Sequence, residues 1–244
     1  MPTLSLVIPL YNEEGNVADL VREITAALPA EDLELILVDD CSTDATVANI
    51  PHHSFIRLLE FSRNRGQSAA MHAGIMAATA PVIALLDGDL QNDPRDIPAM
   101  LAKLAEGYDL VCGYRAKRKD TTFKRLQSRI ANFVRSRFTG DGVRDTGCTL
   151  KVLRTPCRDC LILFRGMHRF IPALIKGGGH RLAEMPVNHR PRISGVSKYG
   201  FGNRALRATT DMFGVKWLLS RQCRYQVKPP RPVPLETAPP TLPV

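Results

Sequence analysis

The feature that most constrains the fold is a short apolar run that stops at a polar loop and recurs along the first third of the chain. The four runs are Leu4–Leu10, Leu33–Val38, Phe55–Phe61 and Pro81–Leu86. Their length and apolar content are typical of buried strands. Between them lie segments with apolar residues at helical spacing. This alternation predicts an α/β fold, a mostly parallel sheet with helices on both faces.

Further elements follow from the same signals of periodicity and turn residues. We expect helices over residues 16–28, 67–78, 97–107 and 203–219, and another that begins near Ala45. Later strands are expected at 109–113, after the turn at 145–151, and at 185–187. Residues 123–138 carry an apolar face among basic residues, which predicts a helix on an anionic membrane or, equally well, a helix packed on the sheet.

Acidic residues follow three of the predicted strands. Because carboxyl ends of parallel strands meet at one edge, where α/β proteins bind ligands, Glu13, Asp39, Asp87 and Asp89 should gather there. Asp87 and Asp89, with the amide oxygen of Gln91, could hold Mg²⁺ or Mn²⁺ against a diphosphate. A solvated loop is the alternative for this pair, and helix capping could account for one of the carboxylates of Asp39 and Asp40.

Charge divides the chain into two unlike parts. Residues 1–114 contain 6 Lys and Arg against 17 Asp and Glu, whereas residues 115–244 contain 27 against 7. The basic part favours an anionic partner such as a phosphate, a lipid surface or nucleic acid. No apolar run approaches the roughly 18 residues of a membrane-spanning helix, and no basic segment precedes an apolar one at the N-terminus. We therefore expect a cytoplasmic chain, with its six cysteines reduced.

Several motifs together resemble a known enzyme family. Val7–Glu14, Val38–Asp44, Asn64–Gly66 and Asp87–Gln91 resemble, in order and spacing, the GT-A (Rossmann-like) fold of family 2 glycosyltransferases. Asp145–Lys151, Gly166–Phe170 and Arg192–Tyr199 look like the polyprenyl-phosphate branch, which includes dolichol-phosphate mannosyltransferase and its undecaprenyl-phosphate relatives. The resemblance covers about residues 3–220. It implies an inverting, metal-dependent hexosyltransferase.

The resemblance also implies roles for individual residues. The nucleotide would be bound by Pro9, Tyr11, Glu13, Asp39 and Asp87, and the metal by Asp87, Asp89 and Gln91. Phosphates of donor and acceptor would meet Arg115, Arg129, Arg192, Ser197 and Lys198. Asp89, Arg115 and Asp145 would form the catalytic group. Asp145 could act as a base, orient the acceptor or shape a turn, and we favour a positioning role because a phosphate acceptor is already anionic.

The expected reaction is transfer of one hexose, of mannose or glucose type, from GDP-mannose or UDP-glucose to polyprenyl phosphate, for use in cell-envelope glycans or glycolipids. Residues 1–200 would form the GT-A domain, 201–228 an amphipathic membrane-proximal helical segment and 229–244, with seven prolines, a disordered tail. Attachment to the inner face of the cytoplasmic membrane would be peripheral, directly or through a membrane-protein partner or homo-oligomer.

Other functions remain open at this point. Within enzymes, these are a glycosyltransferase with a different acceptor or a sugar-nucleotide nucleotidyltransferase, although residues 9–16 lack the basic residues of a triphosphate loop. A nucleic-acid-binding module would explain the basic part of the chain and leave the acidic strand ends unexplained. An inactive scaffold would have no evident use for metal ligands. We expect no nucleic-acid partner.

Overall fold

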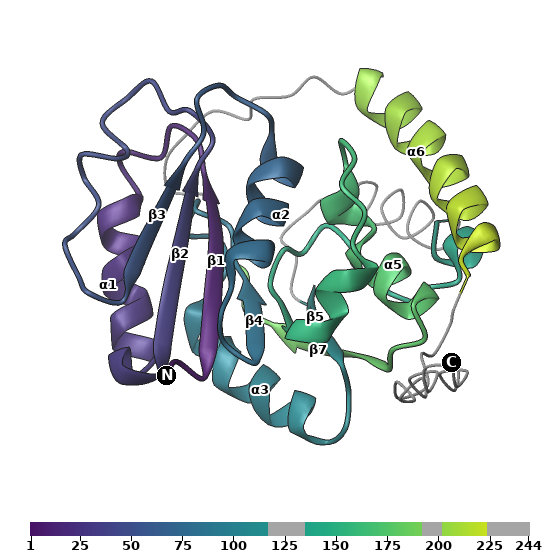
Figure 1. Cartoon of the computed structure of the whole chain (residues 1–244), viewed down its shortest axis with the longest axis horizontal. Coiled ribbons are helices and arrows are strands. Elements are labelled where there is room, and N and C mark those ends of the chain that lie inside the picture. The colour runs from purple at the N-terminus through teal and green to yellow at the C-terminus, as the bar shows by residue number, and fades with distance from the viewer. Residues whose placement is uncertain (117–134, 192–201, 224–244) are drawn as a thin grey trace, which may run out of the picture.

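A single mixed sheet forms the centre of the molecule (Figure 1). The computed structural model describes residues 1–116, 135–191 and 202–223. In chain order the strands are β1 (Leu4–Leu10), β2 (Leu33–Asp39), β3 (Ile56–Glu60), β4 (Val82–Leu85), β5 (Leu110–Arg115), β6 (Lys151–Arg154) and β7 (Leu182–Val187). Their spatial order is β3-β2-β1-β4-β6-β5-β7. Only β6 runs antiparallel to its neighbours β4 and β5. The carboxyl ends of the other six strands therefore share one edge.

Helices cover both faces of this sheet. The α-helices are α1 (Val17–Ala27), α2 (Gln67–Ala77), α3 (Ile97–Ala105), α5 (Ile171–Gly177) and α6 (Gly202–Arg221). Short 3₁₀ turns are η1 (Ala30–Asp32), η2 (Pro94–Asp96), η3 (Thr155–Cys160) and η4 (Met167–Arg169). Residues 135–139 are also helical. One buried cluster joins the sheet to α1 and α3, and a second joins it to α2, α5 and α6.

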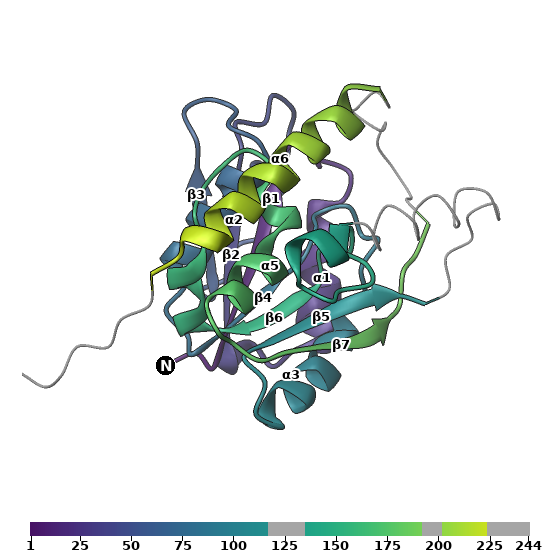
Figure 2. The same ribbon diagram turned by 90° about the vertical axis from the view of Figure 1, so that its right-hand side faces the viewer.

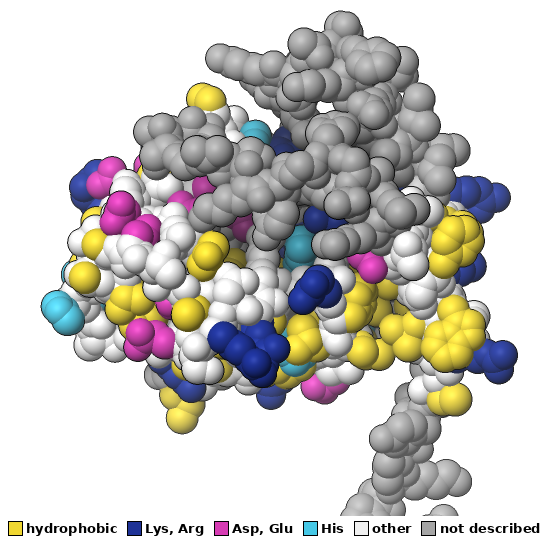
Figure 3. Space-filling model, turned by 90° about the horizontal axis from the view of Figure 1, so that it is seen from above, with side chains coloured by type: hydrophobic (Ala, Val, Ile, Leu, Met, Phe, Trp, Pro, Cys, Tyr) yellow, Lys and Arg dark blue, Asp and Glu magenta, His cyan; other side chains and the backbone are white. Residues whose placement is uncertain are grey.

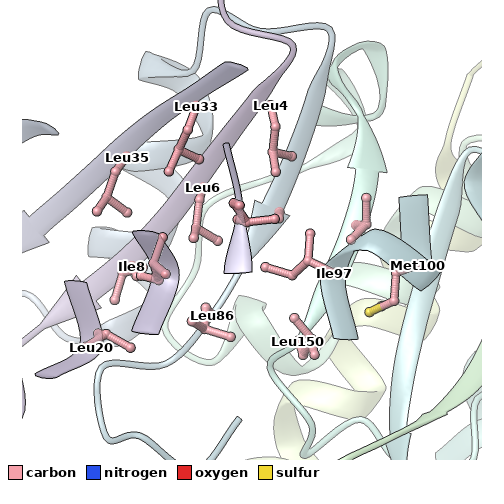
Figure 4. Close-up of a cluster of buried hydrophobic side chains, with 14 of the residues drawn as sticks. Leu4, Leu6, Ile8, Leu20, Leu33, Leu35, Leu86, Ile97, Met100 and Leu150 are labelled. Atoms are coloured by element: carbon pink, nitrogen blue, oxygen red, sulfur yellow. The ribbon is translucent and has the colours of Figure 1, made fainter. Parts of the chain in front are cut away.

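Strand alternation explains why there are two buried clusters. Successive side chains of a strand point to opposite faces, so Leu6 and Ile8 of β1 enter the first cluster while Val7, between them, enters the second. Figure 4 shows part of the first cluster, with labelled leucines of β1 and β2 near Leu20 of α1, and Ile97 and Met100 of α3 on the other side near Leu150. A strand buried on both faces has a nearly continuous apolar sequence, which is the pattern of β1 and β2 apart from Ser5, Glu34 and the last residue of β2, Asp39.

The predicted α/β architecture, a mostly parallel sheet with helices on both faces, is confirmed. The helix expected near Ala45 is wrong, because residues 46–49 form a turn. Asp44 accepts hydrogen bonds from both the N–H and the hydroxyl of Thr46, which closes a local turn instead of capping a helix. The basic helix predicted at 123–138 lies outside the described residues except for 135–138, and the tail at 229–244 lies wholly outside them.

Every described helix is too short or too polar to cross a bilayer.

Candidate active site

Two loops at the carboxyl edge of the sheet interlock. The loop after β1 donates from the Asn12 N–H to the Ser42 hydroxyl, 2.9 Å, and from the Glu13 N–H to the Thr46 hydroxyl, 2.7 Å. In return, the N–H of Thr43 donates to the Asn12 side chain at 2.8 Å. These bonds join loops that are about thirty residues apart in sequence, and they hold the two loops together at the carboxyl edge of the sheet.

The two carboxylates at the end of β2 already have partners within the protein. Asp39 accepts from the Ser42 N–H at 2.9 Å and from the Ser42 hydroxyl at 2.5 Å. Asp40 accepts from the N–H groups of Arg65 and Gly66, at 2.6 and 2.7 Å, just before α2. Both side chains are buried. Each carboxylate thus stabilises a loop. For Asp40, this role differs from both alternatives considered from the sequence, which were helix capping and ligand binding.

Backbone strain gathers at the same edge. Among the described residues, the non-glycine residues with positive φ are Asn12, Cys41 and Leu90, at 53°, 63° and 59°. One follows β1, one follows β2 and one follows β4. For a bulky residue such as Leu90 this left-handed conformation costs roughly 1–2 kcal/mol, and burial of its side chain in the core compensates the cost. Strain held by the surrounding structure is typical of functional loops.

The acidic pair after β4 lies against the end of β1. A Cβ atom placed on Gly88 would come within 2.8 Å of the Leu10 side chain, 3.4 Å of the Pro9 carbonyl oxygen and 3.6 Å of Glu13. Only glycine therefore lets Asp87 and Asp89 approach the loop after β1 so closely. The structure brings together the expected residues Pro9, Glu13, Asp87 and Asp89.

Asp87 carries the most informative electrostatic signal of this edge. Burial, followed by the like charge of Asp89, raises the pKa of Asp87 to about 6. Hydrogen bonds from Thr149 and Gln67 and the charge of Lys151 act in the opposite direction without cancelling that effect. Two carboxylates that repel each other in a buried site favour a cation between them. The chemistry of this pair fits a hard divalent ion.

Three residues that the sequence analysis did not assign to the site stabilise the ionised carboxylate of Asp87. The side-chain amide of Gln67, the first residue of α2, donates to Asp87 at 2.9 Å. Thr149 also donates to Asp87. Lys151, 2% exposed, donates its ammonium to the Cys148 carbonyl and lies on β6 in register with Leu85 of β4. Thr149 and Lys151 belong to the motif at 145–151, so this motif was the sequence signal that could have identified them.

Gln91 is held in place by backbone and side-chain hydrogen bonds to Arg190, which follows β7. Its carbonyl accepts from the Arg190 N–H at 2.8 Å, and its side-chain amide donates to the Arg190 carbonyl at 3.4 Å. The Arg190 guanidinium in turn pairs with Asp93 at 2.9 Å and with Glu23 of α1 at 2.7 Å. Because the nitrogen of the Gln91 side-chain amide donates to the Arg190 carbonyl, the amide oxygen is the atom that could bind a cation.

An arginine–aspartate ion pair lies at the end of β5. Arg115 and Asp145 form a two-pronged ion pair, with Nε to Oδ2 at 2.7 Å and Nη2 to Oδ1 at 2.8 Å. The two side chains are only 14% and 10% exposed. Asp145 also accepts from the Gly147 N–H at 3.2 Å. A bidentate carboxylate fixes the plane of a guanidinium, so Asp145 is built to orient Arg115.

The remaining expected site residues are placed as follows. Tyr11 and Asp39 lie on the interlocked loops beside Glu13. Arg129, Arg192, Ser197 and Lys198 lie outside the described residues. Within the part of the chain that the structure describes, no three His, Cys, Asp or Glu side chains meet as a metal cluster. Mg²⁺ is commonly bound by one or two carboxylates together with waters and substrate phosphates, so the acidic pair has ligands of the right kind for it.

Comparisons with known proteins identify the family of the chain. The model of the family described as Glycosyl transferase family 2 matches residues 5–168. A dodecaprenyl-phosphate galacturonate synthase from Rhizobium johnstonii is 43% identical over 237 residues, which cover 93% of this chain and 69% of that protein. An undecaprenyl-phosphate 4-deoxy-4-formamido-L-arabinose transferase from Salmonella enteritidis PT4 is 38% identical over 205 residues, covering 81% of this chain and 63% of that protein.

A solved structure shares the fold at lower identity. The mannosyltransferase from Pyrobaculum calidifontis in complex with GDP-Man and Mn²⁺ superposes with a TM-score of 0.66 at 19% identity, covering 92% of this chain and 66% of that one. This likeness concerns the fold alone. The family match and the 43% identical relative confirm the resemblance seen in the motifs: the chain belongs to glycosyl transferase family 2.

Proposed function

We propose that the protein transfers a single sugar from a nucleotide diphosphate sugar to the phosphate of a polyprenyl lipid, with inversion at the anomeric carbon. The observation that carries this proposal is the Asp87–Asp89 pair, in which Asp89 is buried and Asp87 half-buried, at the same sheet edge as the Arg115–Asp145 pair. One group is suited to a cation, the other to an anion. The name of each of the two relatives combines a polyprenyl phosphate with a sugar, and this supports a polyprenyl phosphate as the acceptor.

The acidic pair would hold the donor. Asp87, Asp89 and the amide oxygen of Gln91 would bind Mg²⁺ or Mn²⁺, which when present neutralises the departing diphosphate. The interlocked loops with Pro9, Tyr11, Glu13 and Asp39 would receive the nucleoside. Since both Asp39 oxygens already accept from Ser42, this carboxylate would act on the nucleoside mainly through the loop that it shapes.

Arg115 would bind phosphate, and Asp145 would position it. The two oxygens of Asp145 face the Arg115 guanidinium and the Gly147 N–H, which favours a positioning role over a basic one. A phosphate monoester has a second pKa of about 6, so the acceptor needs no base near neutral pH. Three basic residues and one serine outside the described part would complete the acceptor site: Arg129, Arg192, Lys198 and Ser197.

The sugar has two candidate classes. A neutral hexose of mannose or glucose type is the expectation from the motifs, and a hexuronate is favoured by the 43% identical galacturonate synthase. We place the reaction at the inner face of the cytoplasmic membrane, where a lipid acceptor and a soluble nucleotide sugar meet. A membrane-protein partner or a homo-oligomer would be compatible with that place.

The test is a transfer assay. The protein is incubated with Mn²⁺, undecaprenyl phosphate in detergent and, one at a time, labelled GDP-mannose, UDP-glucose and UDP-galacturonate. Label that enters the lipid phase with one donor, and not with Asp89→Ala, supports the proposal. In a separate incubation with a γ-labelled nucleoside triphosphate and a sugar phosphate, release of labelled pyrophosphate would identify a nucleotidyltransferase instead. Transfer to a sugar hydroxyl and not to the lipid phosphate would replace the acceptor class.

A further inference from the structure

Helix α6 presents two chemically different sides. Its inner side packs on the second buried cluster: Val215 is 2% exposed, and Met212, Leu218 and Leu219 pack against the same cluster. Gly177 of α5 lies directly against Leu219. In Figure 2, which faces the right-hand side of Figure 1, α6 lies in front of α5. This side is part of the fold and explains why the helix is ordered there.

The outer side of α6 is apolar at its centre. Phe213 and Trp217, one helical turn apart, are 58% and 64% exposed and are among the most exposed large hydrophobic side chains of the described chain. Phe213 meets Phe138 edge to face at 4.9 Å between ring centres. These rings extend the apolar surface beyond α6 to the helical residues 135–139. Single exposed apolar residues are ordinary, but adjoining aromatic rings indicate a contact surface.

Positive charge borders these rings. Lys216 lies 5.9 Å from the centre of the Phe138 ring, and Arg221 follows in the last turn of α6. The one acidic residue of the described half of α6, Asp211, is directed to the inner side, where a Cβ on Gly166 would come within 2.8 Å of its Oδ2. Figure 3 shows hydrophobic and basic side chains together at the right-hand edge of the molecule, where α6 lies.

We propose that the outer face of α6, formed by Phe213, Lys216, Trp217 and Arg221, docks on an anionic lipid bilayer. Tryptophan and phenylalanine enter the headgroup region, while lysine and arginine stay at the phosphate level and attract anionic lipids. No described helix spans a bilayer, so this contact would be made with the helix lying on the surface. The inference rests on the proposed function in one respect: a lipid acceptor requires the enzyme at a membrane.

The chain supplies its own probe for this contact. Trp217 is its single tryptophan, so all tryptophan emission reports on the outer face of α6. The full-length protein is titrated with vesicles of phosphatidylethanolamine and phosphatidylglycerol that contain no polyprenyl phosphate. We expect a blue shift of the emission and protection from acrylamide quenching, both reduced by high salt because the charge contribution is screened. Vesicles of phosphatidylcholine alone should give a clearly smaller response.

Variants locate the contact. Phe213→Ser keeps the probe and removes one apolar group, and it should weaken vesicle binding about tenfold or more. Lys216→Glu should weaken binding to the anionic vesicles and leave binding to phosphatidylcholine unchanged. Met76→Ser, on α2 and 41% exposed in the wild type, is the matched control and should bind as the wild type does.

Two outcomes with the wild-type protein would overturn the inference. The first is an unchanged Trp217 spectrum with anionic vesicles. The second is a blue shift without lipid that grows with protein concentration and accompanies a doubled mass in analytical ultracentrifugation, which would assign the face to a second copy. The transfer assay in detergent is independent of both. If transfer fails while vesicles still bind, the proposed function falls alone; if Phe213→Ser keeps transfer in detergent and binds vesicles as the wild type does, the docking inference falls alone.

Discussion

The carboxylates at the ends of β2 and β4 look alike in sequence and differ in their surroundings. Asp39 and Asp40, after β2, accept hydrogen bonds from Ser42 and from the backbone before α2. Asp87 and Asp89, after β4, lie beside each other, and burial with mutual repulsion raises the pKa of Asp87 to about 6. Both pairs accept hydrogen bonds from the protein, but only at Asp87 do burial and a neighbouring carboxylate outweigh those bonds. From this difference we predict that the β2 pair stabilises loops and that the β4 pair binds a cation.

The largest expected effect is on transfer. Asp89→Ala should lower turnover by about a thousandfold, because the charge that holds the cation at the diphosphate is lost. Melting temperature and far-ultraviolet circular dichroism should remain close to those of the wild type. Turnover near the wild-type rate with saturating Mn²⁺ would contradict the assignment of the β4 pair to the metal.

The reciprocal change concerns the β2 pair. Asp40→Ala leaves the N–H groups of Arg65 and Gly66 without their charged acceptor, and should lower the free energy of unfolding by about 3 kcal/mol. Urea unfolding measures this effect, with the exposed Glu31→Ala as the control for loss of one negative charge. Affinity for Mn²⁺ at 20 °C should stay within a factor of two. A large loss of metal affinity with unchanged stability would reverse the roles of the two strand ends.

The comparison also predicts a dependence on pH. Protonated Asp87 cannot bind a cation, so Mn²⁺ affinity, measured by calorimetry, should fall about tenfold between pH 7 and pH 5. The free energy of unfolding of the metal-free protein should instead be higher at low pH and fall as the pH rises. Because the folded-state pKa lies above the usual 3.8, the folded protein keeps a proton that the unfolded chain releases, and stability declines as pH rises from about 4 to about 6.

Asp87→Asn provides the control for this pH dependence. The variant cannot titrate at that position, so both the pH dependence of metal binding and the decline in stability should flatten. A wild-type protein that binds Mn²⁺ equally at pH 5 and pH 7 would show that Asp87 is ionised throughout, contrary to its burial beside Asp89.

The smallest effect concerns the support of Asp87. Gln67→Leu removes the hydrogen bond to the ionised carboxylate, so the pKa of Asp87 should rise further and the midpoint pH of Mn²⁺ binding should move upward by about half a unit. Thr149→Val should act in the same direction, since Thr149 also donates to Asp87. A midpoint that moves downward in either variant would mean that these donors stabilise the protonated form.

Much of the fold was readable from the sequence because apolar periodicity encodes burial locally. β1 was predicted with the observed bounds, and β2 and α1 ended within one residue of the prediction. The turn near Ala45 was missed because Asp44 could equally serve a helix or an Asx-type turn, and hydrogen bonds to the loop after β1 decide between them. Local sequence does not contain that distant partner.

The candidate site was readable in part for the same reason. Strand ends bring Glu13, Asp39, Asp87 and Asp89 to one edge by topology alone, so their gathering could be predicted. The two-pronged pairing of Arg115 with Asp145 and the support of Asp87 by Gln67 join residues 30 and 20 positions apart. Such pairings depend on how loops return to the sheet, which periodicity does not specify.

The antiparallel direction of β6 has a consequence for how enzymes of this kind could diversify. Because β6 lies beside β5 and runs against it, the chain leaves the sheet at Arg115 and returns at Lys151 at the same edge. Residues 116–150 therefore begin and end at one edge of the sheet, and they include Asp145, which pairs with Arg115, and Thr149, which donates to Asp87. A chimera with that segment taken from another family member would therefore change the surroundings of Arg115 and of Asp87 in a single step.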